Sequence, residues 1–170
     1  EPMGLVPPEV QALVGTWSEP ELACDPVESG AVRRHAQAIM DEDPRYRPDA
    51  ADPIAPPLFP VNMLRRAWGT PDLLQERARD PDFDGVVPGA GLPPLGALQQ
   101  LPVVNGGSEF EFFRHVRHGD RVTVRQRYAS IEEKATSKGP LVVVVIESEY
   151  ATTAGQLLMR SRRTLLRRAV

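Results

Sequence analysis

Residues 121–168 read RVTVRQRYASIEEKATSKGPLVVVVIESEYATTAGQLLMRSRRTLLRR, and their pattern is that of an antiparallel sheet. Apolar and polar side chains alternate from Val122 to Tyr128, which is the period of a half-buried strand. Residues 141–146 lose this alternation, as a strand buried on both faces does, and residues 157–168 form the last strand. The intervening TSKGP and TTAGQ are turns. The stretch therefore predicts three consecutive strands.

A fourth strand is predicted upstream, over residues 108–116, SEFEFFRHV, because Phe110 and Phe112 alternate with glutamates. The RHGD that follows is interpreted as a turn, with His115 and His118 flanking it and facing solvent. Four strands joined by three tight turns predict an antiparallel meander.

One helix is predicted ahead of the strands, within residues 25–40, DPVESGAVRRHAQAIM. Asp25 is the expected N-cap, and Ser29 is a second candidate start. Val32, Ala36 and Ile39 recur at helical spacing, and small apolar side chains on one face allow close packing on a sheet. We therefore expect an α+β fold in which a curved antiparallel sheet wraps around a helix.

The middle of the chain is irregular. Residues 47–60 form a connector with five prolines, and residues 61–68, VNMLRRAW, predict one or two helical turns that bury Met63, Leu64 and Trp68. Residues 69–102 are a loop-rich insertion, with a short helix expected at residues 73–79, inside a single domain spanning residues 1–170. Such insertions often line or cover a site. Trp68 and Phe83 have two interpretations, a lid over a site or ordinary packing.

Composition narrows the class of protein. The net charge of −3 argues against general nucleic-acid binding, and no apolar run approaches the length of a membrane helix. The N-terminal EPMGLVPPEV lacks the pattern of a signal peptide. Cys24 is the one cysteine, so no intramolecular disulfide can form and a cytoplasmic setting is expected. With three histidines besides Cys24, we expect no metal site, and we expect no cofactor.

These elements, taken in order, resemble the MaoC-like hydratase/dehydratase family, and more narrowly its FAS1-like dehydratase N-terminal-domain branch. The matching pieces are the helix over residues 31–40, the MDEDPRY that contains residues 41–46, the APPLF of residues 55–59, the NGGSEFEFF of residues 105–113, and the strands. The resemblance covers about residues 5–168. It implies a hot-dog fold, with a long central helix held in a strongly curved antiparallel sheet.

The resemblance also implies an activity. Family members hydrate 2-enoyl thioesters, or dehydrate 3-hydroxyacyl thioesters, of coenzyme A or acyl carrier protein. They work as double hot dogs, fused in one chain or formed by two subunits, with the acyl chain in a tunnel at the interface. Their catalytic motif is G-D-x-N-P-[LIV]-H, in which the Asp and the His flank the water that is added or eliminated.

This sequence departs from that motif. Asp41 and Pro44 match it, but Asp43 replaces the asparagine, Arg45 the aliphatic residue and Tyr46 the histidine. A tyrosine with a pKa of about 10 is a poor base at neutral pH. His35 cannot substitute, because it precedes Asp41 by six residues, roughly 9 Å along a helix. The resemblance therefore implies the non-catalytic half of a double hot dog.

Several residues are candidates for the functional site, and each of them also fits a structural role. Asp41 is the best single candidate for chemistry, although it and Asp43 also fit a turn-capping role, and Tyr46 fits the edge of the core. Phe59 and Met63 are expected either to floor an acyl tunnel or to belong to the core.

Two further features have alternative interpretations. Gly106 and Gly107 indicate a bulge or a close backbone approach, or else a surface facing the thioester. The arginine-rich residues 160–168 are a solvated strand face, or else they attract phosphates.

The resulting prediction is a non-catalytic, acyl-binding subunit of a heteromeric (R)-specific enoyl-CoA hydratase or 3-hydroxyacyl-thioester dehydratase. Its partner is a catalytic MaoC-like subunit, in a heterodimer or heterotetramer. Its substrate is an acyl-CoA or acyl-carrier-protein thioester, with a bulky or long acyl group such as a steroid side chain. The alternatives are a self-sufficient homodimer using Asp41 and Tyr46, a thioesterase in which Asp41 or Glu42 directs water, and an acyl-binding scaffold.

Overall fold

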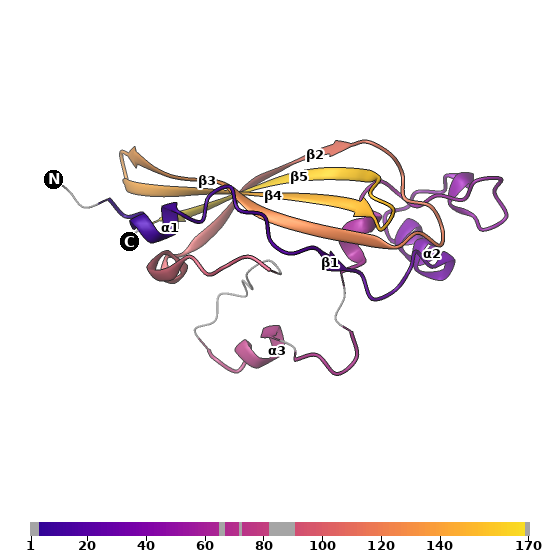
Figure 1. Ribbon diagram of the computed structural model, residues 1–170, viewed down its shortest axis with the longest axis horizontal. Coiled ribbons are helices and arrows are strands. Elements are labelled where there is room, and N and C mark those ends of the chain that lie inside the picture. Colours follow the sequence, from indigo (N-terminus) through magenta and orange to yellow (C-terminus); the bar gives the residue numbers. More distant parts are fainter. Residues whose placement is uncertain (1–3, 65–66, 72, 82–90, 169–170) are drawn as a thin grey trace.

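A five-stranded antiparallel sheet forms the body of the protein (Figure 1). The computed structural model describes residues 4–64, 67–71, 73–81 and 91–168. The strands are β1 (Glu21–Leu22), β2 (Val103–Phe112), β3 (Val122–Thr136), β4 (Gly139–Thr152) and β5 (Leu157–Arg168), in the order β1-β3-β4-β5-β2. The predicted α+β class is confirmed, as are the strands predicted after residue 102.

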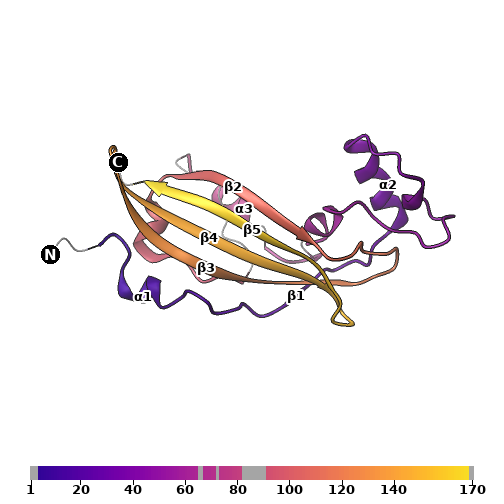
Figure 2. The ribbon, with the colours of Figure 1, turned by 90° about the horizontal axis from the view of Figure 1, so that it is seen from above.

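The position of β2 differs from the predicted meander. β2 pairs with β5, with Phe110 opposite Ser161, and not with β3. RHGD is a turn as predicted, with the Asp120 N–H bonded to the Arg117 carbonyl oxygen, but it does not close a hairpin between β2 and β3. The segment pairs instead with the proline-rich connector, where Ile54 forms a β-bridge with Arg117. The chain therefore leaves β2 at one edge, crosses the end of the sheet and enters β3 on the other side (Figure 2). The β3–β4 and β4–β5 hairpins are as predicted.

The helix α2 spans Ser29–Ala38, so it begins at the second of the two predicted starts. Asp25 is not its N-cap, because Glu28 occupies that position with an extended backbone. Val32 and Ala36 are the buried residues of α2, as the helical spacing predicted. Ile39 does not continue this buried face, because α2 ends at Ala38 and Ile39 is its exposed C-cap. In both ribbon views α2 lies beyond one end of the sheet and not along its centre (Figures 1 and 2).

Two clusters of buried side chains form the core. The first cluster consists of residues from α2, from the segment 46–63 that follows it, and from the sheet. Its main members are Val32, Ala36, Tyr46, Phe59, Met63, Val122, Val124, Tyr150, Leu158 and Met159. The second joins Val10, Leu92, Leu95 and Leu98 to Tyr128, Ile131, Val142, Val144 and Ile146 at the other end of the sheet. Each buried Val, Leu, Ile, Phe or Met side chain contributes about 1.5–3 kcal/mol. Part of the predicted insertion, residues 92–98, is therefore core.

The remaining elements are short. They are α1 (Pro8–Gln11), η1 (Pro44–Tyr46), η2 (Phe59–Asn62), α3 (Leu73–Arg77) and η3 (Gly96–Gln100), where η denotes a 3-10 helix. α3 confirms the short helix predicted at residues 73–79. In the described ranges, no helix is long and apolar enough to cross a membrane.

Trp68 corrects one core prediction. It is fully exposed, whereas Met63 is buried as predicted and Leu64 is half-buried. The reason is that the chain turns here instead of continuing as a helix, with the Thr70 N–H bonded to the Ala67 carbonyl. Phe83, the other aromatic residue of this region, lies outside the described residues.

Candidate functional site

The segment after α2 is a tight turn that its own carboxylates hold together. α2 ends at Ala38, and Met40 turns the chain with a left-handed φ of 57°. Oδ1 of Asp41 then accepts the backbone N–H of Asp43 at 3.2 Å. Oδ1 of Asp43 accepts the backbone N–H of Arg45 at 2.9 Å. Both aspartates therefore cap the turn, as aspartates in turns commonly do.

A charged pair occupies two positions at which the motif is neutral. Nη2 of Arg45 lies 2.6 Å from Oδ2 of Asp43. Hydrogen bonds from the Arg45 side chain and backbone lower the pKa of Asp43 to about 2. Asp43 is consequently ionised at neutral pH, and it contributes an anion where the family motif has an amide.

Tyr46 occupies the position of the missing histidine and contacts the retained aspartate. Its hydroxyl donates to Oδ2 of Asp41 at 2.9 Å. The side chain is buried, with 8% of its surface exposed. Burial and the hydrogen bond to Asp41 together raise the pKa of Tyr46 to about 12. The phenol therefore keeps its proton at neutral pH and cannot serve as a general base there.

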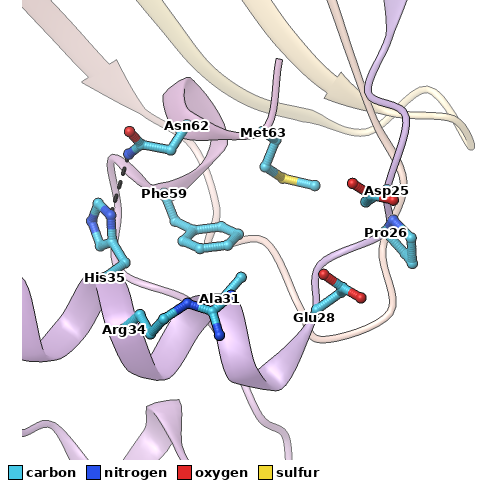
Figure 3. A pocket seen from close by; sticks show the side chains of 9 residues that line it. All are labelled: Asp25, Pro26, Glu28, Ala31, Arg34, His35, Phe59, Asn62 and Met63. Carbon is cyan, nitrogen blue, oxygen red and sulfur yellow. Dashed lines mark hydrogen bonds between the residues drawn. The ribbon is translucent and has the colours of Figure 1, made fainter. Parts of the chain in front are cut away.

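Two cavities flank α2, and four of the predicted site residues line them. Asp41 and Tyr46 line one cavity of about 590 Å³. Phe59 and Met63 line the other, of about 450 Å³ (Figure 3). The structure thus brings Asp41 together with Tyr46, and Phe59 together with Met63, but it does not join the two pairs in one cavity.

The second cavity combines an apolar floor with a polar rim. Figure 3 shows Phe59 and Met63 between η2 and α2, with Asp25, Glu28 and Arg34 around them. Such a surface can hold an apolar group whose polar end points outward.

His35 lines this second cavity as well, on the side of α2 away from Asp41. Its Nδ1 lies 3.2 Å from Nδ2 of Asn62, and its ring meets that of Phe59 edge-on, with centroids 5.5 Å apart. Sequence reasoning missed Asn62, which follows His35 by 27 residues and belongs to no recognisable motif.

Gly106 and Gly107 line neither of these cavities, since both lie on β2. The register with β5 shifts between Asn105 and Gly107, which confirms the predicted bulge. A Cβ at Gly106 would lie 3.0 Å from Cγ2 of Thr164 and 3.1 Å from Cγ of Leu166. The close backbone approach is therefore also confirmed, and it explains why this position has no side chain.

His115 and His118 are half-buried, so the prediction that both face solvent is wrong. Nδ1 of His115 lies 3.2 Å from the Ala55 carbonyl oxygen, and Nε2 of His118 lies 3.2 Å from that of Ile54. The two imidazoles attach the connector to the segment that crosses the end of the sheet.

The arginine-rich end of the chain is largely engaged within the sheet. Arg160 pairs with Glu149 and Arg162 pairs with Glu147. Arg167 is buried, and its Nη1 donates to the carbonyl oxygen of Leu98. These contacts favour the structural interpretation of residues 160–168 over attraction of phosphates. Within the described part of the chain, no group of three or more His, Cys, Asp or Glu side chains is placed to hold a metal ion.

The five-stranded antiparallel sheet, with the Asp41–Tyr46 turn after α2, fits the MaoC-like hot-dog class that the sequence resembles. The sequence model of the family described as "FAS1-like, dehydratase domain region" matches residues 12–161. The chain therefore belongs to this family of hydratases and dehydratases, and the predicted hot-dog fold is confirmed.

Individual proteins agree with this assignment. The chain is similar to a UPF0336 protein of Streptomyces avermitilis, 32% identical over 168 residues, which cover 94% of this chain and 95% of that protein. It is 29% identical over 163 residues to a probable enoyl-CoA hydratase alpha subunit of Thermomonospora curvata, covering 93% of this chain and 50% of that protein. Its fold is similar to that of a chain in the ChsH1–ChsH2 complex of Mycobacterium tuberculosis, with a TM-score of 0.65 at 15% identity, covering 94% of this chain and 86% of that chain.

Proposed function

We propose that this chain is the acyl-binding subunit of a heteromeric (R)-specific enoyl-thioester hydratase or 3-hydroxyacyl-thioester dehydratase, and that it lacks the catalytic base. The hydrogen bond from Tyr46 to Asp41 carries the proposal. It places a phenol where the family motif has a histidine, and it engages the aspartate that the motif retains.

The chemistry requires a group that exchanges protons near neutral pH. Hydration adds the oxygen of water to C3 of the enoyl thioester and a proton to C2, and dehydration reverses both steps. A histidine meets this requirement, whereas Tyr46, with a pKa of about 12, does not. Asp41 is bonded to Tyr46 and to the Asp43 N–H. The base therefore comes from a second, MaoC-like subunit in a heterodimer or heterotetramer.

The substrate of this assembly is the thioester of a bulky or long acyl group, such as a steroid side chain, carried by coenzyme A or by acyl carrier protein. The cavity with Phe59 and Met63 on its floor supports this assignment, because it offers about 450 Å³ beside a polar rim. The name of the Thermomonospora curvata relative, an alpha subunit, and the two-protein ChsH1–ChsH2 complex support a heteromeric assembly.

The test compares the chain alone with the chain in a complex. The second protein is a MaoC-like protein encoded beside this one that has an intact D-x-N-P-x-H motif. We expect no hydration of crotonyl-CoA by the chain alone and turnover when the two are mixed. Replacing the motif histidine of the companion with alanine abolishes that turnover, whereas Asp41→Ala in this chain leaves most of it.

Other outcomes would point to the alternative functions. Turnover by the isolated chain that disappears in Asp41→Ala would show a self-sufficient enzyme and overturn the proposal. Release of free thiol from acyl-CoA would indicate a thioesterase. A stable complex without turnover of any enoyl thioester would indicate a scaffold.

A further inference from the structure

A polar stripe crosses the inner face of the sheet, the face that carries the buried strand residues of both core clusters. Side chains alternate between the two faces of a strand, so the strand registers show which residues share this face. From β3 through β4 and β5 to β2, three successive rows are Val124–Tyr150–Met159–Phe112, Gln126–Ser148–Ser161–Phe110 and Tyr128–Ile146–Arg163–Ser108. The middle row contains the stripe, which consists of Gln126, Ser148 and Ser161 and separates the two apolar clusters.

The polar groups on this part of the face lack hydrogen-bond partners within the described part of the chain. Oε1 of Gln126 is buried and accepts no hydrogen bond. Ser148 and Tyr150 are 5% and 6% exposed, yet neither hydroxyl is hydrogen-bonded to a described residue. Buried polar groups in folded proteins are normally hydrogen-bonded, and leaving them unpaired costs stability. The stripe is therefore able to bind a polar group that comes from outside this chain.

Arg163 lies beside the stripe and is the exception on an arginine-rich strand. The other arginines of β5 all bond to carboxylates or carbonyl oxygens: Arg160, Arg162, Arg167 and Arg168. Among the described residues, Arg163 has neither a hydrogen bond nor an ion pair. Its neighbours on the adjacent strands are Ile146 and Ser108, and neither is a carboxylate. Arg163 thus brings an unpaired positive charge to the apolar side of the sheet.

Arg163 is close enough to the stripe to act together with it. Ser148 and Ser161 stand directly opposite each other, and Arg163 is the diagonal neighbour of Ser148, about 7–8 Å away, a distance that a long side chain spans. Burial raises the pKa of Tyr150, the guanidinium of Arg163 opposes that rise, and the carboxylate of Glu21 adds to it. The guanidinium and the hydroxyls are all hydrogen-bond donors, which suits an oxygen anion.

The stripe continues from the cavity proposed for the acyl group. Phe59 and Met63, on the floor of that cavity, belong to the same buried cluster as Tyr150 and Met159. In both ribbon views α2 lies beyond one end of the sheet, so this helix does not cover the stripe (Figures 1 and 2). Along β5, Arg163 follows Met159 by four residues, about 14 Å in a strand. A long acyl chain that enters beside Phe59 and Met63 and follows the inner face therefore reaches Arg163 with its far end.

We propose that Arg163, with Ser148 and Ser161, binds a carboxylate at the far end of the acyl group, so that the substrate is the thioester of a dicarboxylic acid. The proposal rests on the acyl-binding function proposed above, and it adds the chemistry of the end of the substrate remote from the thioester. A carboxylate fits better than a neutral oxygen, because it accepts two parallel hydrogen bonds from a guanidinium and neutralises its charge. The two serine hydroxyls donate to the lone pairs of the carboxylate that remain.

Saturated acyl-CoA thioesters test this site without requiring turnover. The main probes have acyl chains of equal length, one ending in a carboxylate and the other in a methyl group. Isothermal titration calorimetry is carried out on the complex with the MaoC-like companion, or on the chain alone if no complex forms. We expect the carboxylate-ended probe to bind about tenfold or more tightly than the methyl-ended one. A third probe that ends in a hydroxyl should gain about threefold at most.

Variants on the two faces of β5 assign this preference to Arg163. Arg163→Met should remove it, and Arg163→Lys should retain part of it, because lysine keeps the charge but not the planar fork. Ser161→Ala should reduce the preference by about threefold. Arg162→Met is the matched control, because Arg162 is the adjacent residue, lies on the opposite face of the sheet and pairs with Glu147. The preference should persist in that variant.

The proposal is overturned if wild type binds the carboxylate-ended and methyl-ended probes equally, if the hydroxyl-ended probe binds as tightly as the carboxylate-ended one, or if the preference survives in Arg163→Met. Weaker assembly of Arg163→Met with the companion, without a change in probe selection, would also overturn it and would place the partner of the guanidinium on the companion. Failure of the proposed function is distinct: the complex would select the carboxylate-ended probe in these titrations, yet it would hydrate no enoyl thioester.

Discussion

The Tyr46 hydroxyl lies 2.9 Å from Oδ2 of Asp41, so the two ends of the degenerate motif are in direct contact. Tyr46 is the fifth residue after Asp41, and the capped turn at Asp43 and Pro44 brings them together. The turn therefore directs the side chain at position 46 toward the aspartate. The change is chemical, because an imidazole that titrates near neutral pH is replaced by a buried phenol that does not.

Removing the hydroxyl should measure what this contact contributes to stability. In Tyr46→Phe, Asp41 loses one hydrogen bond inside a partly buried turn, and we expect the free energy of unfolding to fall by about 1–2 kcal/mol. The melting temperature should fall by about 2–6 °C. Tyr150→Phe is the control, because Tyr150 is as buried as Tyr46 but its hydroxyl has no hydrogen bond in the described structure. Equal losses in the two variants would contradict a specific role for the Tyr46–Asp41 bond.

The buried tyrosines also predict that the free energy of unfolding falls at alkaline pH. The pKa of Tyr46 is raised to about 12, and burial raises the pKa of Tyr128 and Tyr150. A raised pKa means that the folded state binds the proton more tightly than the unfolded state, whose tyrosines titrate near 10. The stabilisation is therefore complete below about pH 10 and is lost as pH rises toward about 12.

Guanidinium unfolding at pH 9 and pH 11 should accordingly show lower stability at the higher pH. Tyr46→Phe should reduce that difference, because it removes the phenol whose pKa is raised to about 12. A pH dependence that is identical in wild type and Tyr46→Phe would exclude Tyr46 as a source of it.

The sequence predicted the strands well because alternation is a local property. It failed on the partner of β2, since pairing Phe110 with Ser161 joins residues 51 positions apart and no short pattern encodes that choice. It also failed on Trp68, because helical spacing describes a face only if the helix forms, and the chain turns at Ala67–Thr70 instead.

In the candidate site, too, local features were predictable from the sequence and long-range ones were not. The five-residue spacing of Asp41 and Tyr46 made their proximity predictable once the motif was recognised. The separation of that pair from Phe59 and Met63 was not predictable, because it depends on which side of α2 each segment passes. The contact between His35 and Asn62 could likewise not be predicted from the sequence, because it joins α2 to a residue of η2 that lies 27 positions further along the chain.

Among the ion pairs of the sheet, those of Glu147 should be the most sensitive to mutation. Burial opposes its ionisation, but hydrogen bonds from Arg162 and Arg127 outweigh that effect and lower its pKa. Glu147→Gln leaves two arginines without their shared partner, and we expect a loss of about 1–2 kcal/mol, moderated by the exposure of both arginines. Urea unfolding measures the loss, and Glu132→Gln, which removes an exposed carboxylate from the same face, should change stability by less than about 0.5 kcal/mol.

The carboxylates of Glu147 and Glu149 predict that the protein loses stability at acid pH. The pKa values of Glu147 and Glu149 are both lowered on folding, so their stabilising contribution is complete above the unfolded value of 4.5 and is lost as pH falls below it. Urea midpoints should fall from pH 6 to pH 3.5, and by less in Glu147→Gln than in wild type. A larger fall in the variant would contradict the assignment.

Arg167 should fix the segment before β2 onto the sheet. Its Nη1 donates to three carbonyl oxygens, those of Leu98 at 3.1 Å, Gln99 at 3.3 Å and Leu101 at 3.0 Å. Because the donor is charged and buried, Arg167→Met should destabilise the protein by about 2 kcal/mol, and proteases should cleave residues 96–101 faster. Arg163→Met, which removes an exposed arginine from the same strand, is the control. If both variants were cleaved at the wild-type rate, docking of this segment would depend on the apolar contacts of Leu95 and Leu98 and not on the arginine.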